Sequence, residues 1–151
     1  MSRWSTPGSP GWRRCSISTR KETQGAGAAG GTGGALVAWG ATLAPGAAEV
    51  AQLIGLAEAI AGADVVITGE GSYDGQSGDG KVPSFIAALA AESGAAALLA
   101  AGRITADADA SLFTASASLT DLAGSSDSAL AEPAHWLREA GAALARRAGS
   151  R

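Results

Sequence analysis

A short polar segment offers the clearest chemistry in the sequence. It follows the β-branched run Asp64–Thr68 and is rich in glycine. Its charged side chains are Glu70, Asp74, Asp79 and Lys81, and its amide and hydroxyl side chains are Ser72, Gln76 and Ser77. Carboxylates bind magnesium or accept a proton, glycines expose backbone amides, and a lysine before a helix start attracts phosphate. Phosphoryl transfer uses these groups, although a solvated connection between two elements is the alternative interpretation.

Within this segment we expect Glu70 and Asp74 to act as catalytic residues and as metal ligands, because two nearby carboxylates repel each other unless a cation lies between them. Lys81 is expected to neutralise phosphate charge. The expected contacts with nucleotide or substrate are Gly69, Gly71, Ser72, Gln76 and Ser77. The alternatives are that Lys81 extends into solvent and that Asp74 only shapes a turn.

Two glycine motifs have weaker support. Gly75 to Lys81 has the spacing of a phosphate-binding loop, but Val82 stands where that loop needs Ser or Thr. Gly25, Gly27 and Gly30 have the spacing of a dinucleotide fingerprint, but polar residues precede them where a buried strand belongs. The motif at Gly27 and Gly30 leaves open a phosphate cradle of backbone amides, a tight turn or close helix packing.

The elements around the polar segment indicate an α/β fold with a βαβ unit. Asp64–Thr68 and Ala96–Ala100 are apolar runs typical of buried parallel strands. Pro83 suits the first turn of a helix between them, with Phe85, Ile86 and Leu89 inward, and Gly94 can end that helix. A strand, helix and strand in this order predict two parallel strands joined by a right-handed crossover.

Other elements follow from periodicity and breaker residues. The glycine-rich run 25–34 predicts a loop that leads into a helix, and the apolar spacing in 50–60 predicts a second helix with Val50, Leu53, Ile54, Ala57 and Ile60 on one face. A third strand is expected near Leu112–Ser116. A closing helix is expected over Pro133–Ala148, with Leu137, Ala140 or Gly141, and Leu144 inward.

Charge and composition limit the classes of partner. Residues 1–22 hold five basic residues and one acidic residue, a net +4, so the rest of a chain with net charge −3 carries −7. An acidic body argues against a nucleic-acid-binding protein, which needs a basic face. The sequence has no apolar run long enough to span a membrane, and one cysteine, Cys15, allows no internal disulfide. The cytosol is the expected compartment.

Residues 1–23 differ from the sequence that follows. They place Trp4 and Trp12 among Ser, Pro, Gly and Arg without periodicity, which is typical of a disordered or unrelated leader. Arg13 and Arg14 do not precede the apolar stretch that an export signal requires. The expected organisation is therefore a leader over 1–23, one domain portion over 24–148 and a tail over 149–151.

Several motifs together resemble the bacterial glycerate kinase family of the two-domain α/β type. They are, in chain order, the glycine run from Gly25, the Pro45-Gly46 pair, the segment 63–77, the segment Gly80-Lys81-Val82-Pro83, and Ala101-Gly102-Arg103-Ile104. The run Ile67–Ser77 is the most specific of these. The resemblance covers roughly residues 24–148.

The resemblance implies phosphorylation of D-glycerate by ATP with magnesium, in a cleft between two domains. It implies binding roles for Gly27, Gly30 and Arg103 beside the polar segment, and leaves open whether carbon 2 or carbon 3 is phosphorylated. Family members are much longer, so the chain is expected to be a carboxy-terminal, truncated portion with weak or no activity alone.

Two other functions are kept as alternatives. A truncated domain without catalytic activity would self-associate through the apolar surface left exposed. A hydrolase would use Ser77, Asp121 and His135 in that order. The hydrolase has little support, since Asp79 stands at the last position of the nucleophile motif and His135 begins a helix beside Trp136.

Overall fold

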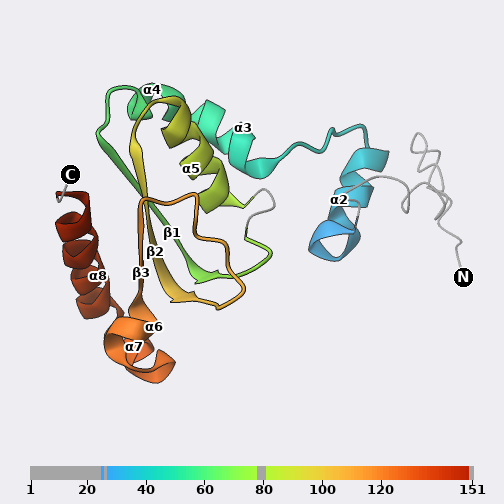
Figure 1. Cartoon of the computed structure of the whole chain (residues 1–151). Helices are drawn as coiled ribbons and strands as arrows, with labels where there is room; N and C mark the ends of the chain where they lie inside the picture. Colours follow the sequence, from blue (N-terminus) through green and yellow to red (C-terminus); the bar gives the residue numbers. More distant parts are fainter. Residues whose placement is uncertain (1–24, 26, 78–80, 150–151) are drawn as a thin grey trace, which may run out of the picture. The chain divides into compact units, whose positions relative to one another are not determined.

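The computed structural model describes residues 25, 27–77 and 81–149, and Figure 1 shows their helices and strands. The chain divides into two compact units, Met1–Ala44 and Pro45–Arg151, and each is described by itself. The leader predicted over 1–23 lies outside the described residues. That boundary stays a prediction.

The described part of the first unit contains helix α2, Ala28–Ala38. Its first turn is irregular, because Ala29, Gly30 and Gly31 have positive φ angles of 50°, 66° and 94°. Glycine adopts such angles without a steric penalty from Cβ, so the glycine run here makes an irregular helix start. The predicted order of a glycine-rich turn followed by a helix is therefore confirmed, although the helix begins inside the glycine run.

Among the described residues of the second unit, three strands form one parallel sheet. They are β1 (Val65–Tyr73), β2 (Ala96–Ile104) and β3 (Ala115–Ser118), in that spatial order. Helix α5 (Val82–Glu92) connects β1 to β2. The pairing of the two strands runs from Val65 opposite Ala96 to Tyr73 opposite Ile104. The predicted α/β class and βαβ unit are confirmed, and the parallel register places the ends of β1 and β2 side by side (Figure 1).

Helices cover both faces of this sheet. Alternate residues of β2 point to opposite faces, so Ala97, Leu99 and Ala101 pack with Ala87 and Ala90 of α5. On the other face, Leu98 packs with Ala115 of β3 and Leu144 of α8 (Pro133–Ala148). The many alanines keep the side chains short, which allows the helices to lie close to the strands.

The predicted helix over 50–60 is wrong as a single element. Gly55 has a φ of 65° and separates α3 (Gly46–Leu53) from α4 (Leu56–Ile60). Val50, Leu53 and Ile54, which precede the break, are exposed, while Ala51 and Ile60 are buried. A left-handed glycine ends a helix even where the apolar spacing continues, and this explains the difference.

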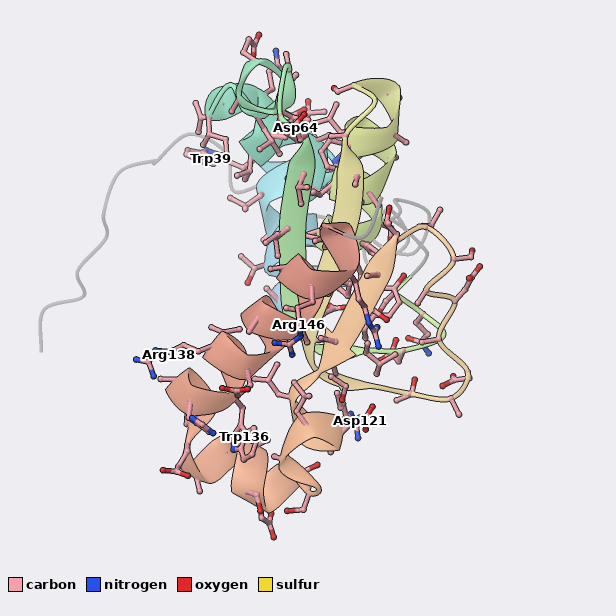
Figure 2. All side chains as sticks on the ribbon, turned by 60° about the vertical axis from the view of Figure 1, so that its left-hand side comes forward. Trp39, Asp64, Asp121, Trp136, Arg138 and Arg146 are labelled. Carbon is pink, nitrogen blue, oxygen red and sulfur yellow. The ribbon has the colours of Figure 1, made fainter. Side chains whose placement is uncertain are left out.

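The remaining elements differ from the predictions in detail. β3 begins three residues later than the predicted strand, and short helices α6 (Leu119–Ala123) and α7 (Ser126–Ala131) follow it. The closing helix has the predicted bounds, and Ala140 and Leu144 are buried as expected. Leu137, predicted to face inward, is 56% exposed. In Figure 2, Trp136 lies near the start of this helix, and its indole N–H donates to the carbonyl of Ser128 in α7 (3.1 Å).

Candidate functional site

The polar segment becomes a loop only at Asp74, because Gly69–Tyr73 extend β1 instead of leaving the sheet. The loop therefore begins at the carboxyl end of β1, next to the carboxyl end of β2. Ligands of open parallel sheets bind outside this edge. The structure thus places Asp74, Gln76, Ser77 and Lys81 together in the loop and leaves Gly69, Glu70, Gly71 and Ser72 on the strand.

Asp74 is the centre of a hydrogen-bonded turn. Its Oδ1 accepts from the Gln76 backbone N–H (3.0 Å), the Ser77 hydroxyl (3.2 Å) and the Lys81 ammonium (3.3 Å). The bond from Gln76, followed by the bond from Lys81, lowers the pKa of the Asp74 carboxyl below its ordinary value. Asp74 is therefore an anion at neutral pH and a weak general base, since an efficient base has a pKa near the working pH.

Ser77 joins this turn to helix α5. Its buried hydroxyl accepts from the Asp74 backbone N–H (3.0 Å) and from Lys81 Nζ (3.1 Å), and its carbonyl accepts from the Ser84 hydroxyl. These bonds are all internal to the protein. Ser77, expected as a ligand contact, is thus placed to hold Asp74 and Lys81 in register.

Lys81 precedes the first turn of α5 and is the N-cap residue of that helix. Its side chain is 39% exposed and that of Asp74 is 36% exposed. A pair this open to water adds little stability, because solvent screens it. The ammonium group and the positive end of α5 instead combine to make this edge attractive to an anion.

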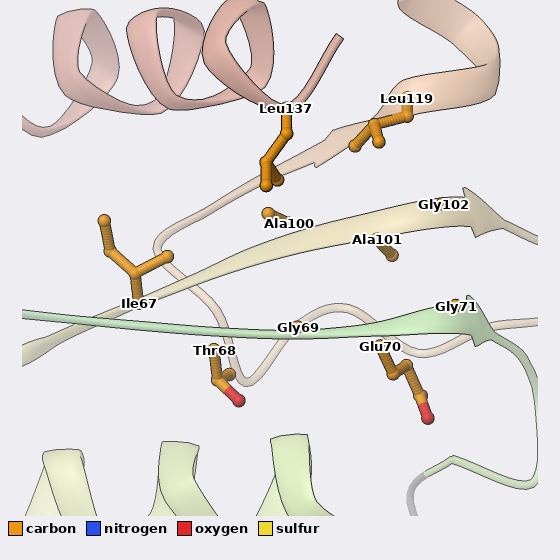
Figure 3. Close-up of a pocket in the computed structure, with 10 residues that line it drawn as sticks. All are labelled: Ile67, Thr68, Gly69, Glu70, Gly71, Ala100, Ala101, Gly102, Leu119 and Leu137. Carbon is orange, nitrogen blue, oxygen red and sulfur yellow. The ribbon is translucent and has the colours of Figure 1, made fainter. Parts of the chain in front are cut away.

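Glu70 has a different environment from Asp74. Its side chain leaves β1 on the side of the sheet toward α5 (Figure 3), and its Oε1 is buried without a hydrogen-bond partner. A buried carboxylate oxygen without a partner is unfavourable, so this atom is suited to bind a cation or to accept a hydrogen bond from a ligand hydroxyl.

The expected joint metal site of Glu70 and Asp74 has no direct contact to support it. Asp74 Oδ1 already accepts three donors, including the lysine cation. Over the described ranges, no three His, Cys, Asp or Glu side chains come together as a metal-binding group. Asp74 therefore has its own partners in this structure, and Glu70 is not one of them.

Ser72 and Arg103 face each other on β1 and β2, where Arg103 Nε donates to the Ser72 hydroxyl (2.8 Å). Arg103 is exposed near the carboxyl end of β2. A guanidinium there can bind a carboxylate or phosphate in a bidentate manner. These two predicted residues are therefore brought together by strand pairing, although they lie 31 positions apart.

Of the two glycines of β1, only Gly69 lies where a side chain would prevent close strand packing. A Cβ on Gly69 would meet the backbone carbonyl of Ala100, whereas a Cβ on Gly71 would meet nothing within 4 Å. Both glycines line an open pocket of about 490 Å³ on the face toward α8, together with Ile67, Leu119 and Leu137 (Figure 3). The walls of this pocket are mainly apolar, and the Glu70 side chain points to the opposite face (Figure 3).

Three other predicted residues belong to the first unit or fall outside the described residues. Gly27 and Gly30 belong to the first unit, where Gly27 precedes α2 and Gly30 lies in its irregular first turn. Asp79 lies within 78–80, outside the described residues.

Sequence reasoning missed Asp107, an acidic residue in the loop after β2. A Cβ built on Gly75 would lie 2.6 Å from Asp107 Oδ2, so Asp107 lies directly against the Asp74 turn. Bonds to Thr105, and more weakly to the Gly75 backbone, lower the pKa of the Asp107 carboxyl, while the nearby Asp74 charge opposes this shift. The available signal was its position, because loops after neighbouring parallel strands meet at one edge.

The glycerate kinase family model matches residues 13–149. The chain belongs to the glycerate kinase family. An uncharacterized protein of Mycobacterium bovis is 38% identical over 129 residues, which are 83% of this chain and 34% of that protein. A glycerate 2-kinase of Escherichia coli is 44% identical over 88 residues, 58% of this chain and 23% of that enzyme. A glycerate kinase of Bacillus subtilis is 38% identical over 94 residues, 62% of this chain and 25% of that enzyme.

The chain thus spans about a third or less of the length of these curated relatives. The family match begins at residue 13 and so includes part of the predicted leader. No solved structure gives a significant match.

The hydrolase alternative gains no support from the described residues. Ser77 is buried in the β1 loop, Asp121 is exposed on α6, and His135 stacks edge-to-face on Trp136 with ring centroids 4.6 Å apart. No hydrogen bond or ion pair joins these three side chains in the described part of the chain.

Within those same ranges, no helix combines the length and apolar character needed to cross a membrane.

Proposed function

We propose that this chain provides one part of a glycerate kinase active site, which transfers the terminal phosphoryl group of ATP to D-glycerate with magnesium. Family membership supports the reaction class. The structural observations behind the proposal are the Asp74, Ser77 and Lys81 cluster at the start of α5 and the orphaned oxygen of Glu70 on β1.

Lys81 is the residue proposed to contact the transferred phosphate. Its ammonium and the start of α5 both favour an anion, and phosphoryl transfer depends on stabilising charge that spreads over phosphate oxygens. Asp74 and Ser77 hold the ammonium through bonds of 3.3 and 3.1 Å. Their proposed role is thus to keep the cation in place before substrate arrives.

Glu70 is the carboxylate that best fits a magnesium ion or a reacting hydroxyl. Its Oε1 is buried and lacks a partner, and magnesium in phosphate sites is usually held by one or two carboxylates with phosphate oxygens and water. When bound, the ion would neutralise phosphate charge. The balanced reaction forms a bond from a glycerate oxygen to phosphorus, breaks the bond to ADP, and releases the hydroxyl proton to a base or to water.

Arg103 and the glycine amides complete the proposed set of contacts. Arg103, held by Ser72, is suited to the carboxylate of glycerate or to a phosphate. We also propose contacts with the reactants at Gly69 and Gly71, which line the pocket, and at Gln76 in the turn. The backbone amides of Gly27 and Gly30 are proposed to contact the nucleotide.

The test uses the chain alone and a hybrid in which it replaces the matching segment of the Bacillus subtilis glycerate kinase. We expect little or no product from the chain alone, because holding both reactants in line requires the rest of the cleft. In the hybrid, Lys81→Met and Glu70→Gln should each lower kcat about 10²–10³-fold. Arg138→Met and Glu139→Gln on α8 are the matched controls and should retain turnover.

Each outcome of this test has a clear meaning. Near-normal turnover in both site variants, with the fold intact, would assign the loop to structure and contradict the proposal. A hybrid that folds but makes no phosphoglycerate would reject the kinase function for this segment. Substantial turnover by the chain alone would show that the rest of the cleft is dispensable.

A second candidate function is self-association without catalysis. Ile67 is 60% exposed and Leu137 is 56% exposed, and both line the same apolar pocket. Contiguous exposed apolar surface favours association. Sedimentation of the chain should then show a dimer or larger species that Ile67→Asp converts to a monomer, whereas a monomer at all concentrations would reject this candidate.

A further inference from the structure

The loop after β2 is fixed against the end of β1. The Thr105 backbone N–H donates to the Tyr73 carbonyl (3.0 Å), and the Tyr73 hydroxyl donates to the Asp109 carbonyl (2.9 Å). Tyr73 is fully buried, and its ring meets Phe113 edge-to-face at 5.6 Å. Because both ends of this short segment are anchored, the residues between Thr105 and Asp109 have a defined position.

Asp107 lies in this anchored segment and touches the Asp74 turn at Gly75. A Cβ on Gly75 would lie 2.6 Å from Asp107 Oδ2 and 3.2 Å from the Asp107 carbonyl oxygen. A side chain at this position would displace the Asp107 carboxylate. Thr105 and the Gly75 backbone both lower the pKa of the Asp107 carboxyl, as donors to that carboxylate would.

The contact with Gly75 acts on the residues that carry the proposed chemistry. Gly75 is the first central residue of the turn that the Asp74 carbonyl closes with the Ser77 N–H (2.8 Å). The backbone N–H of its neighbour Gln76 donates to the Asp74 carboxylate, and this bond is the largest cause of the lowered pKa of Asp74. Holding the Gly75 N–H therefore fixes the plane of the turn and, through Asp74 and Ser77, the place of the Lys81 ammonium.

We infer that Asp107 is a positioning residue for the proposed phosphoryl-transfer site: its carboxylate holds the Gly75 N–H and thereby orients the turn that presents Asp74 and Lys81. The functional part of this inference rests on the proposed kinase function. The structural part concerns this chain alone. Asp107 links the loops of two neighbouring strands, so a residue of the β2 loop controls the geometry of the β1 loop.

The inference is tested on the full chain by amide hydrogen exchange, with each amide monitored by nuclear magnetic resonance. Asp107→Ala should speed exchange of the Gly75 amide by about tenfold or more, because the amide loses the charged acceptor that lies against it. It should also shift the Gln76 and Lys81 amide resonances. Asp107→Asn should restore most of the protection, since its amide oxygen can accept the same bond.

Asp109→Ala is the matched control. Asp109 lies two residues away, and its carboxylate accepts from the Ser111 backbone N–H (2.9 Å) instead of facing the turn. The control should leave Gly75 exchange unchanged. In every variant the buried Leu99 amide should keep its protection, which reports that the fold is intact.

Two results would overturn the inference. One is unchanged Gly75 exchange in both Asp107 variants, and the other is an equal effect of Asp109→Ala, which would indicate general loosening of the loop. If Asp107→Ala fails to fold, Asp107→Asn provides the test instead. The Gly75 and Gln76 resonances must then shift from their wild-type positions in Asp107→Asn and stay in place in Asp109→Ala. In an active hybrid, Asp107→Ala should also lower kcat about tenfold and Asp107→Asn should restore it. An inactive hybrid would count against the kinase proposal and leave the exchange result valid.

Discussion

The two faces of the sheet are covered to different extents. On the α5 face, Leu99 and Tyr73 are fully buried against alanines of α5 and the ring of Phe113. On the α8 face, the helix covers β2 and β3, where Leu98 is buried, but Ile67 of β1 remains 60% exposed. Apolar side chains thus make a core on one face and an open surface on the other, because among the described residues of this unit only α5 packs over β1.

The proposed chemistry depends on the well-packed face of the sheet. The α5 face holds the anchored end of β1, on which Asp74, Lys81 and Asp107 depend. The open face carries the apolar pocket and contributes less to the packing of this chain. Variants on the two faces should therefore differ most in their effect on folding.

The largest expected effect is that of Leu99→Ala. Removing this fully buried side chain should lower the free energy of unfolding by about 2–5 kcal/mol, through lost burial and the cavity left behind. Ile67→Ala on the same sheet should change it by less than about 0.5 kcal/mol, as is usual for exposed positions. Denaturant unfolding measures both, and a large loss for Ile67→Ala would show that the α8 face is covered in solution.

A smaller effect is expected where the backbones of β1 and β2 approach closely. Gly69→Ala should destabilise the chain by roughly 1–3 kcal/mol, because its Cβ meets the Ala100 carbonyl and one strand has to shift. Gly71→Ala, two residues along, meets nothing within 4 Å and serves as the control. Equal thermal midpoints for the two variants would mean that the strands separate easily at this point.

Much of the fold was predictable because its signals are local. The apolar runs before residues 69 and 101, the proline at position 83 and the glycine at position 94 identify strand, helix and strand, and Pro133–Ala148 has a clear helical pattern. Gly69–Tyr73 was assigned to the loop because glycine, glutamate and serine are poor strand formers. Pairing with Ala100–Ile104 overrides that preference, since the ladder satisfies their backbone groups.

The site was predictable in part for the same reason. Asp74, Gln76, Ser77 and Lys81 lie within eight consecutive positions, so their proximity follows from sequence. The role of Ser77 as an internal link depends on its burial under α5, and the contact of Asp107 with Gly75 depends on strand order. Neither leaves a pattern in one sequence, and the distinct surroundings of Glu70 and Asp74 required side-chain coordinates.

The smallest expected effect concerns pH and the Asp74 turn. Hydrogen bonds from Gln76 and Lys81 lower the pKa of Asp74 in the folded chain below its ordinary value of 3.8, so folding favours the ionised form. The resulting stabilisation is fully present above the unfolded-state pKa of about 3.9 and is lost as pH falls through the lower folded-state value. Asp74→Asn cannot titrate, and the wild-type chain should therefore lose more stability than this variant between pH 7 and pH 3. Asp109 also has a lowered pKa, but it remains in both proteins and its contribution cancels in the comparison. Asp107 remains too, and loss of the Asp74 charge in the variant lowers the pKa of Asp107 further, which makes the expected difference smaller. Unfolding midpoints in denaturant, measured for both proteins across this range, provide the test. A difference between them that stays constant with pH would show that the Asp74 bonds do not form in solution, and a difference that grows in favour of the wild type toward low pH would reverse the sign argued here.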